Sequence, residues 1–528
     1  MHPNRKISCI IVGVIIFSSF LSGCSTLSNI LGVSVTINNE DVCDNDGFAG
    51  LNINFSCTGT IYLKTFGVDD SEMDSEPFFY GDHQVILNIA PYRSSANQGE
   101  YKVKAYDGSN NEVFQETISL NGADLTIDSC SQKWWKRDAW KGGYSLIGLI
   151  IDVTNNGDAP AYPYTAEIIA DSKSDSGDIL PCVVLPGESK TIKCYLYLED
   201  EPSDSTFTLN LKDSDDEILS SNTYDVVFTD TVNVEKFKWS YNGRSLSLSV
   251  PYPDFLHEYY KNLDQIVLAD YSLYVFDKYD DTYLDLISDQ LQFTTSTQTD
   301  MDKINFAAAF IQNLDYRSDV TEFDDPNYPL ETLFNTDGGC DCEDMSILTA
   351  SILDRMGYEV ALLRLTNHMA VGVKLDTISG YSAYDSGYYF LETTSKNHVV
   401  GYIPSAYTSK PGLEIYKIDS RALLVHNWYD GNLTIFKNTE RGDVVKVSTI
   451  VTNLGLATVE NVVVEGVFST ENGLEYNEWN TIPLIKSGMK AKTTILIDIP
   501  SDMETDFTTR VYLSNKVVDE VESAESFP

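Results

Sequence analysis

The pattern of apolar and polar residues divides this chain of 528 residues into β-rich segments and one segment with a helical period. Runs such as 33–37 and 51–55 alternate apolar with polar residues, as half-buried strands do. From about 237 to 426 the period lengthens to that of amphipathic helices. We predict helices at 254–260, 301–311 and 343–356, followed by strands at 360–365, 370–375 and 388–392. Helices followed by antiparallel strands favour an α+β domain in this part of the chain.

These changes of pattern predict several domains, because a chain of this length is too long for one core. The predicted segments are a signal at 1–24, a β-sandwich-like domain at 25–125, an Ig-like sandwich at 126–232, an α+β domain at 233–426 and a second Ig-like sandwich at 427–528. The predicted fold class is therefore multidomain, with a central α+β domain and Ig-like β-sandwich domains on both sides.

An internal repeat links the second and last of the β-rich segments. Residues 153–159 and 451–457 share the pattern Val-Thr-Asn-x-Gly-x-Ala. Each copy is followed by a further strand and a turn-strand unit, which indicates a repeated β domain. The pattern resembles the CARDB-type modules of archaeal and bacterial surface proteins, and this resemblance implies spacer or adhesion modules.

The charge of the chain excludes one class of partner. Acidic residues number 79 and basic residues 36, and the formal net charge is −43. A polyanionic surface repels nucleic acid, so we expect no nucleic-acid partner. Acidic runs such as 213–217 leave calcium binding open as an alternative, but they lack the spacing of an EF-hand loop, so this signal is weak.

The N-terminus has the features of a targeting segment. Arg5 and Lys6 precede an apolar run at 7–21, which is short for a membrane span and ends in Leu-Ser-Gly-Cys at Cys24. These four residues resemble the lipobox of prokaryotic lipoproteins, which implies a lipid on Cys24 after cleavage. An uncleaved signal anchor is the alternative. Both predict a protein at the extracellular face of the cell membrane, held there by its N-terminus.

Seven cysteines remain beyond Cys9 and Cys24. An oxidising compartment would allow the disulfides Cys43–Cys57 and Cys182–Cys194, each within a predicted strand-turn-strand unit. An odd number leaves at least one thiol free, and Cys342 is the natural candidate.

Cys342, His368 and Glu392 form the candidate catalytic group. Cys342 lies where a glycine-rich stretch that includes Gly339 meets a predicted helix, and a helix N-terminus favours a reactive thiolate. Backbone N–H groups there could bind an oxyanion. His368 follows a predicted turn and opens a strand, from which it could act as base and then acid. Glu392 on the next strand could orient the imidazole. The other histidines weighed for this role are His257, His398 and His426.

Gly-x-Cys-x-Asp at a helix start, then a histidine opening a strand, then an acidic residue on the next strand, resembles the transglutaminase-like superfamily. The resemblance is to its prokaryotic, cysteine-protease-like branch. It implies a papain-like α+β core in which Cys342 is the nucleophile, His368 the base and Glu392 the third member. It also implies that Asp344 and Gly339 support the loop and the helix start. The chain departs from the pattern in having Glu392 for aspartate and Cys340 for a small residue.

The function expected from these features is acyl transfer at the cell surface. Cys342 would attack an amide or peptide carbonyl and form a thioester, which water or an amine would resolve as hydrolysis or cross-linking. The expected partner is a protein or peptide substrate, such as a cell-envelope protein, and no metal or organic cofactor is implied. Three alternatives remain: a catalytically silent surface adhesion or scaffold protein, an inert buried thiol and histidine, and zinc held by Cys340, Cys342, Asp344 and His368.

Overall fold

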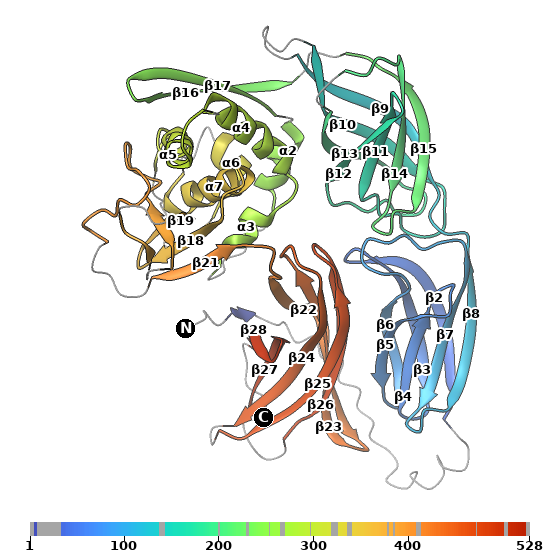
Figure 1. The fold of residues 1–528 in the computed structure, drawn as a ribbon. Coiled ribbons are helices and arrows are strands. Elements are labelled where there is room, and N and C mark those ends of the chain that lie inside the picture. The colour runs from blue at the N-terminus through green and yellow to red at the C-terminus, as the bar shows by residue number, and fades with distance from the viewer. Residues whose placement is uncertain are drawn as a thin grey trace.

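The chain folds into four units that follow one another along the sequence (Figure 1). The structure is a computed structural model. It describes residues 5–7, 33–136, 143–198, 201–228, 232–252, 254–263, 270–295, 297–317, 326–334, 340–376, 380–383, 386–407, 413–470, 473–500 and 505–523. Strands make up 55% of the described residues and helices 13%.

The first unit contains two sheets around one core. The three-stranded sheet has the order β2-β3-β6 and the four-stranded sheet the order β5-β4-β7-β8. The strands are β2 (Val35–Asn45), β3 (Phe48–Cys57), β4 (Ile61–Phe66), β5 (Glu72–Phe78), β6 (Gly81–Asn88), β7 (Gly99–Asp107) and β8 (Glu112–Leu120). On β3, Leu51, Ile53 and Phe55 are buried, because every second side chain of a strand faces the same way.

The second unit is a single seven-stranded sheet with the order β15-β14-β11-β12-β13-β10-β9. Its strands are β9 (Leu125–Lys136), β10 (Tyr144–Asn155), β11 (Thr165–Ala170), β12 (Lys173–Ile179), β13 (Ser189–Leu198), β14 (Thr206–Lys212) and β15 (Ile218–Asp225). Leu149, Ile151 and Val153 alternate along β10 and are fully buried.

The third unit holds all the helices that the described residues form. Its elements are β16 (Asn233–Tyr241), β17 (Arg244–Tyr252), α2 (Asp254–Lys261), α3 (Ser272–Phe276), α4 (Asp281–Thr294), α5 (Asp300–Ile311), α6 (Pro329–Phe334), α7 (Cys342–Arg355), β18 (Val360–Leu365), β19 (His368–Lys374), β20 (Tyr388–Leu391) and β21 (Glu414–Ile418). The last four strands form one sheet in the order β20-β19-β18-β21, and β16 pairs with β17. Helix α7 packs against β18 and β19 through buried residues such as Met345, Leu348 and Ile352.

The fourth unit again has two sheets, with the orders β22-β23-β26 and β1-β28-β27-β24-β25. Its strands are β22 (Leu424–Thr439), β23 (Gly442–Asn453), β24 (Val459–Thr470), β25 (Glu475–Ile485), β26 (Lys490–Asp498), β27 (Thr505–Leu513), β28 (Lys516–Ser523) and the short β1 (Arg5–Ile7), which pairs with β28 in parallel. The strand β1 therefore belongs to the fourth unit, although in sequence it precedes β2 of the first unit.

The two copies of the repeated motif form the same turn in the second and fourth units. Asn155 Nδ2 donates to the carbonyls of Ala159 (2.8 Å) and Val184 (2.9 Å), and its Oδ1 accepts from Gly157 N. Asn453 repeats these bonds with Ala457 (2.7 Å) and Ile485 (3.2 Å), and with Gly455 N. Both asparagines are fully buried, so each satisfies backbone groups that would otherwise lack partners. The repeated sequence is therefore a repeated structural device.

Replacing Asn453 by alanine should lower the free energy of unfolding by about 1–3 kcal/mol, because two buried carbonyls lose their donors. Urea titration measures this change. Asn480→Ala is a suitable control, since the exposed Asn480 donates to Thr494 O at 3.3 Å from the surface of β25 and should cost less than about 0.5 kcal/mol. Equal losses in the two variants would contradict the importance of the buried turn.

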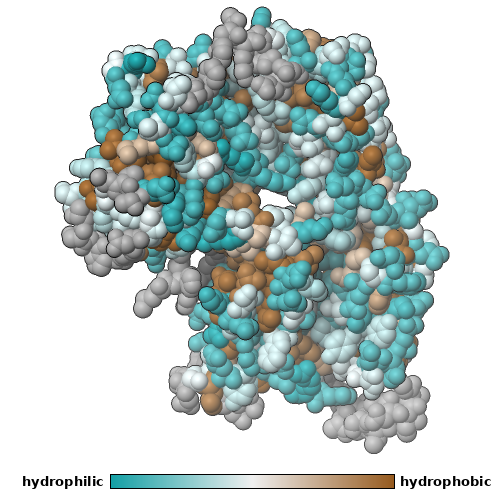
Figure 2. Space-filling view, in the orientation of Figure 1, coloured by the Kyte–Doolittle hydropathy of each residue, from teal (hydrophilic) through white to brown (hydrophobic). Residues whose placement is uncertain are grey.

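Polar contacts join each unit to the next, and the fourth unit returns to the first. The contacts are Ser95 N to Asp213 Oδ2 (3.0 Å), Lys278 Nζ to Asp178 Oδ1 (2.6 Å), Arg421 Nη2 to Asp270 Oδ2 (2.7 Å) and Lys446 Nζ to Glu76 Oε2 (2.7 Å). The four units thus form a closed circle of contacts. The face of the molecule in Figure 2 is largely hydrophilic, in keeping with its net charge.

The predicted fold class is wrong. The chain is mostly β-sheet, and its described residues show no central papain-like α+β domain. The physical reason is that the helices share their core with strands and with two residues of the neighbouring unit. The largest apolar core contains the helices of the third unit, the β16–β17 hairpin and also Leu180 and Tyr195 of the second unit. The helical period in the sequence predicted the helices, but it could not predict which other elements pack against their apolar faces.

The two disulfides that the sequence would allow, Cys43–Cys57 and Cys182–Cys194, are not formed. All seven cysteines that the structure describes carry free thiols. In the β2–β3 hairpin Cys43 lies opposite Gly50, while Cys57 lies opposite Val35, so the two cysteines are at opposite ends of the hairpin. Cys194 lies within β13, opposite Leu149 of β10 and Ile179 of β12, where its thiol is buried.

The helices in the described ranges are all too short or too polar to cross a membrane. The predicted lipid site at Cys24 and most of the predicted signal at 1–24 lie outside the described residues.

Candidate active site

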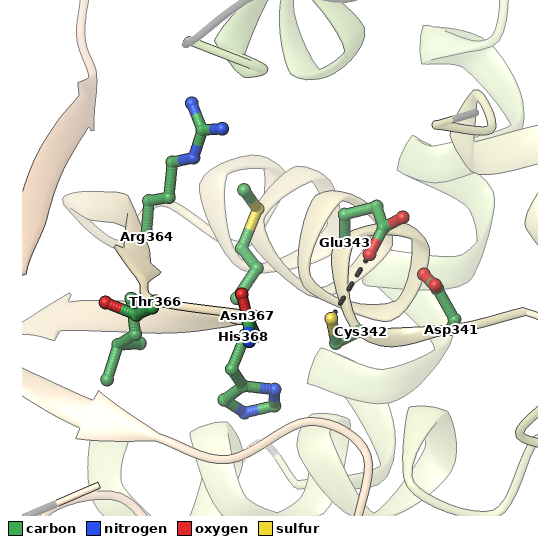
Figure 3. A pocket seen from close by; sticks show the side chains of 9 residues that line it. Asp341, Cys342, Glu343, Arg364, Thr366, Asn367 and His368 are labelled. Carbon is green, nitrogen blue, oxygen red and sulfur yellow. Dashed lines mark hydrogen bonds between the residues drawn. The ribbon is translucent and has the colours of Figure 1, made fainter. Parts of the chain in front are cut away.

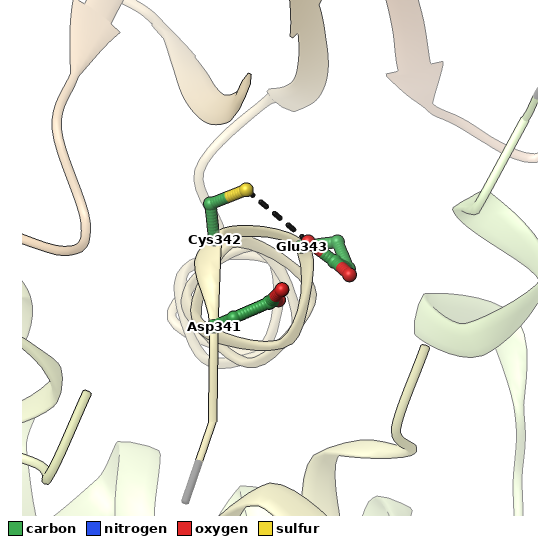
Figure 4. A group of neighbouring side chains, drawn as sticks. All are labelled: Asp341, Cys342 and Glu343. Carbon is green, nitrogen blue, oxygen red and sulfur yellow. Dashed lines mark hydrogen bonds between the residues drawn. The ribbon is translucent and has the colours of Figure 1, made fainter. Parts of the chain in front are cut away.

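Cys342 is the first residue of helix α7 (Figure 4). Two residues on, Asp344 holds the start of the helix: its Oδ2 accepts from the backbone N–H of Asp341 at 3.2 Å. Its carboxylate also accepts from Asn327, at 2.7 Å from the backbone N–H and 2.8 Å from the side-chain amide. Asp344 therefore ties the Cys342 backbone to the segment that precedes α6.

Burial dominates the electrostatics of Asp344. It raises the pKa of this carboxyl to about 7, against the lowering effect of the Asn327 hydrogen bonds. The hydrogen bonds place Asp344 in a supporting position, because both of its oxygens already accept from backbone or amide N–H groups.

A two-residue turn positions His368. Leu365 pairs with His368, so Thr366 and Asn367 form the tip of the β18–β19 hairpin. Asn367 has a φ of 61°, a left-handed conformation that asparagine tolerates better than most residues. The histidine thus opens β19 with its ring almost fully buried.

Glu392 follows directly after β20, which pairs with β19, and it faces His368 from there. His368 Nε2 lies 3.1 Å from Glu392 Oε2. The other carboxylate oxygen accepts from the N–H of Thr394 (2.9 Å) and from its hydroxyl (2.7 Å). Gln312 on the far side donates to the backbone carbonyl of Glu392 at 2.8 Å. Glu392 is therefore fixed at both its side chain and its backbone.

The histidine and the glutamate form an ion pair. Burial acts on His368 most strongly and lowers its pKa, but hydrogen bonds to Cys342 and Glu392 and the charges of both groups outweigh it and raise the pKa to about 9. Burial likewise opposes ionisation of Glu392, yet the bonds from His368 and Thr394 lower its pKa to about 2. At neutral pH the site holds an imidazolium next to a carboxylate. Since Nε2 faces Glu392, the other ring nitrogen remains for Cys342.

A second carboxylate lies beside the thiol. Cys342 Sγ donates to Glu343 Oε2 at 3.2 Å (Figure 3). These groups border a cavity of about 460 Å³ between the start of α7 and the β18–β19 hairpin. The cavity is lined by Asp341, Cys342, Glu343, Arg364, Leu365, Thr366, Asn367, His368 and Met369. A substrate in this cavity would meet the thiol, the imidazole and both acidic and basic side chains.

The expected zinc ligands do not come together as a set. Cys340 is buried, its thiol donates to the carbonyl of Asp315 at 3.4 Å, and burial raises its pKa to about 12. Asp344 is engaged by Asn327. The ligand atoms that do lie within 4.8 Å of one another belong to Asp341, Cys342 and Glu343 (Figure 4). A metal here would occupy the thiol and would use two carboxylates in place of a histidine.

The other histidines are engaged elsewhere. His426 contacts Asp519 through Nδ1 and Thr509 through Nε2, each at 2.8 Å, within the fourth unit. His398 stacks on Tyr402, with ring centroids 4.9 Å apart. His257 lies on α2, outside the residues that line the cavity. The structure thus brings His368, and none of these three, to Cys342.

Two residues of the site were not found from the sequence. Glu343 lies among several acidic residues, Asp341 and Asp344 included, so it was not singled out from the sequence. Its position directly after a candidate nucleophile was nevertheless a visible signal. Tyr407 stacks on the His368 ring and comes from a loop far along the chain, so no local pattern marks it. Gly339 lies outside the described residues.

Comparison with known proteins adds no family. No family model and no curated protein matches the chain. Among solved structures, a tetra-tandem repeat from the extending region of a large adhesion protein is 10% identical over 94% of this chain and 99% of that chain, with a TM-score of 0.19. The YadV chaperone is 9% identical over 37% of this chain and 100% of that chain, with a TM-score of 0.14. The exo-chitosanase CsxA of Amycolatopsis orientalis is 8% identical over 91% and 76%, again with a TM-score of 0.14. Similarities this weak carry no argument about fold or function.

Proposed function

We propose that this protein is a cysteine enzyme that transfers acyl groups from amide or peptide carbonyls, with Cys342 as nucleophile, His368 as base and acid, and Glu392 as the third member. One observation carries the proposal. The buried imidazole of His368 lies 3.1 Å from Glu392 and lines the same cavity as Cys342, and the three residues stand at the start of α7, at the start of β19 and directly after the end of β20. The order of the residues along the chain, which resembles that of the transglutaminase-like superfamily, supports the same chemistry.

The proposed reaction starts from the form of the site in which His368 carries the proton and the Cys342 sulfur is a thiolate beside the imidazolium. The sulfur attacks the carbonyl carbon, and the π electrons of the carbonyl move to its oxygen. When that oxyanion collapses, the C–N bond breaks, His368 gives its proton to the leaving amine, and a thioester remains on Cys342. Water or a primary amine then attacks the thioester, His368 accepts its proton, and the thiolate leaves.

The position of Cys342 supports the oxyanion part of this reaction. The first N–H groups of a helix have no partners within the helix, and Cys342 stands at that position of α7. Donors placed there can stabilise the negative oxygen of the intermediate. Glu392 keeps the imidazole charged and oriented without taking the proton itself.

The proposed location is the extracellular face of the cell membrane, with a protein or peptide substrate there. The features of the N-terminal segment and the likeness of the Val-Thr-Asn-x-Gly-x-Ala motif to surface modules support it. Since that segment was read from sequence alone, fractionation of cells expressing the full chain, with and without Cys24→Ala, tests it. Release of the Cys24→Ala protein from the membrane fraction supports a lipid anchor, and retention contradicts it.

Labelling of the folded, reduced protein with iodoacetamide tests the catalytic proposal. Cys342 should react faster than Cys340 by about tenfold or more at pH 7, because Cys340 is buried and its thiol pKa is raised to about 12. Peptide mass spectrometry reads both sites in one sample, so Cys340 serves as an internal control. Equal, slow labelling of the two cysteines would contradict an activated thiol.

A catalytically silent scaffold is the second candidate, and the contact between Cys342 and Glu343 favours it. A carboxylate that accepts the thiol proton at 3.2 Å opposes formation of a thiolate. In that case the cavity binds a partner without turnover, and Cys342→Ala retains binding. Slow labelling of Cys342 that becomes fast in Glu343→Gln would support this candidate.

A further inference from the structure

We propose that Tyr407 is a positioning residue for His368: its ring holds the imidazole in the plane that directs the two ring nitrogens toward Cys342 and Glu392. The inference rests on the proposed function, because the orientation of a base matters only where a base is used. The contact itself is independent of that function and can be tested without a substrate.

The stack between the two rings is close and nearly parallel. The centroids of Tyr407 and His368 are 4.3 Å apart, and their planes differ by 4°. The bond from Nε2 to Glu392 (3.1 Å) acts at the edge of the ring, and Cys342 lines the same cavity as the ring. Edge contacts fix where the ring points but resist its tilt poorly. A flat ring against its face supplies the missing constraint and covers that face from water.

Tyr407 is itself held in place. Its backbone N–H donates to the carbonyl of Pro404 at 2.9 Å, which closes a tight turn. Its side chain packs against a small apolar core that includes Leu363, Leu365 and Phe390, on strands of the sheet that carries His368. The same sheet therefore fixes the imidazole and the ring that covers it, as a positioning role requires.

The charge of His368 strengthens the contact. An aromatic face attracts a cation placed over it, and the imidazolium of His368 is such a cation at neutral pH. The other charged or titratable groups around it are Glu392, Cys342, Asp341, Glu343 and Arg364. Burial raises the pKa of Tyr407, and the charges of Glu392 and Cys342 raise it further, so its ring remains a neutral phenol near both groups.

Titration of His368 by NMR, in the full chain with labelled histidine, tests the inference. In Tyr407→Leu the volume of the side chain is largely kept but the aromatic face is lost. The midpoint of the His368 titration should fall by about one pH unit, and labelling of Cys342 at about pH 8.5, between the old and new midpoints, should slow about threefold. Tyr407→Phe keeps the face and should retain the wild-type midpoint. If the leucine variant does not fold, Tyr407→Met takes its place.

A second stack in the same unit provides the control. Tyr402 lies against His398 with centroids 4.9 Å apart and planes 12° apart, and the histidine that bonds the Glu392 side chain is His368 and not His398. Tyr402→Leu should leave the titration of His368 and the labelling of Cys342 as in the wild type. If folded Tyr407→Leu also leaves both unchanged, Tyr407 has no positioning role and the inference is wrong.

The two proposals fail in different ways. If the chain proves to have no acyl-transfer activity while Tyr407→Leu shifts the His368 titration, the proposed function fails and the control of His368 by Tyr407 stands. If the chain is active and Tyr407→Leu keeps the wild-type titration and labelling, the proposed function stands and the positioning role of Tyr407 fails.

Discussion

Glu392→Gln should lower kcat/KM for amide cleavage or transfer by about 10²–10⁴-fold, the range expected when the partner that orients and charges a catalytic base is removed. The amide keeps the size of the side chain but carries no charge. Burial, which acts on His368 most strongly, then lowers its pKa without the carboxylate to oppose it. Fewer molecules hold an imidazolium at neutral pH, so the thiolate of Cys342 loses its counter-ion.

The pH dependence of stability checks the same ion pair without any substrate. The pKa of His368 is about 9 in the folded chain against an ordinary 6.5. Its contribution to the free energy of unfolding is therefore complete below pH 6.5 and is lost as the pH rises through 9. The pKa of Glu392 is about 2 against an ordinary 4.5, so its contribution is complete above pH 4.5 and is lost as the pH falls through 2. Stabilisation by the pair is thus greatest between pH 4.5 and 6.5, and Glu392→Gln should flatten this maximum.

Glu359→Gln is the matched control for Glu392→Gln. Glu359 accepts from the hydroxyl of Tyr388 at 2.6 Å at the opposite end of the β18–β19–β20 sheet, and its side chain is more than half exposed. The variant should keep activity within about twofold of wild type, as exposed sites usually do. If Glu392→Gln behaves like Glu359→Gln in both rate and pH profile, Glu392 is not the third member of the site.

The sequence carried more information about local structure than about how the units combine. The alternating run at 51–55 lies in β3, and the predicted helix at 343–356 matches α7 (Cys342–Arg355) to within a residue. Asn155 and Asn453 could be recognised as a repeat, because the bonds of the turn lie mainly within the motif itself. Where a residue's partners are close in sequence, pattern and structure agree.

Some local features were missed although they left a signal. Helix α4 (Asp281–Thr294) was not predicted, yet Leu284, Ile287 and Leu291 recur at helical spacing and are buried. The strand expected to carry Glu392 ends one residue before it, at Leu391, which frees the glutamate to turn toward His368.

Features that depend on residues far apart in the sequence could not be predicted from it. The stack of Tyr407 on His368 and the cavity between α7 and the hairpin arise only when the sheet forms. The predicted fold class was wrong for the same reason, since Leu180 and Tyr195 of the second unit enter the core of the helices. Periodicity shows that a helix has an apolar face but not what covers that face.

The contact between the first and fourth units contains a buried network of charged side chains, and breaking it should cause a large loss of stability. Glu76 on β5 accepts from Lys446 (2.7 Å) and Lys492 (2.6 Å) of the fourth unit, and all three side chains are buried. Asp74 accepts from Lys492 as well, at 2.9 Å. Burial raises the pKa of Glu76, but the two lysines outweigh it and hold the pKa at about 2. The network therefore stays ionised in mild acid, and its contribution is lost only as the pH falls from 4.5 through 2.

Glu76→Gln should lower the free energy of unfolding by about 3–5 kcal/mol, because it leaves two buried ammonium groups without their shared carboxylate. Urea titration measures the loss, and a larger radius of gyration in X-ray scattering would show that the first and fourth units have separated. Glu72→Gln is the control: its partner Lys64 lies 2.8 Å away on the same sheet, but that pair is exposed and should be worth less than about 1 kcal/mol.

Replacing Glu76 and Lys446 together by methionine separates two explanations of such a loss, because Lys492 keeps its ion pair with Asp74 at 2.9 Å. If the stability of the junction depends on leaving no charge unpaired, the double variant should recover wild-type stability or exceed it, because apolar contacts replace a costly pair of buried charges. If the double variant is as unstable as Glu76→Gln and also expands, the ion pairs themselves hold the circle closed. A Glu76→Gln protein with wild-type stability and dimensions would contradict both explanations, and the closure would then rest on the remaining contacts between the two units, such as Lys490 with Asp46 at 2.8 Å.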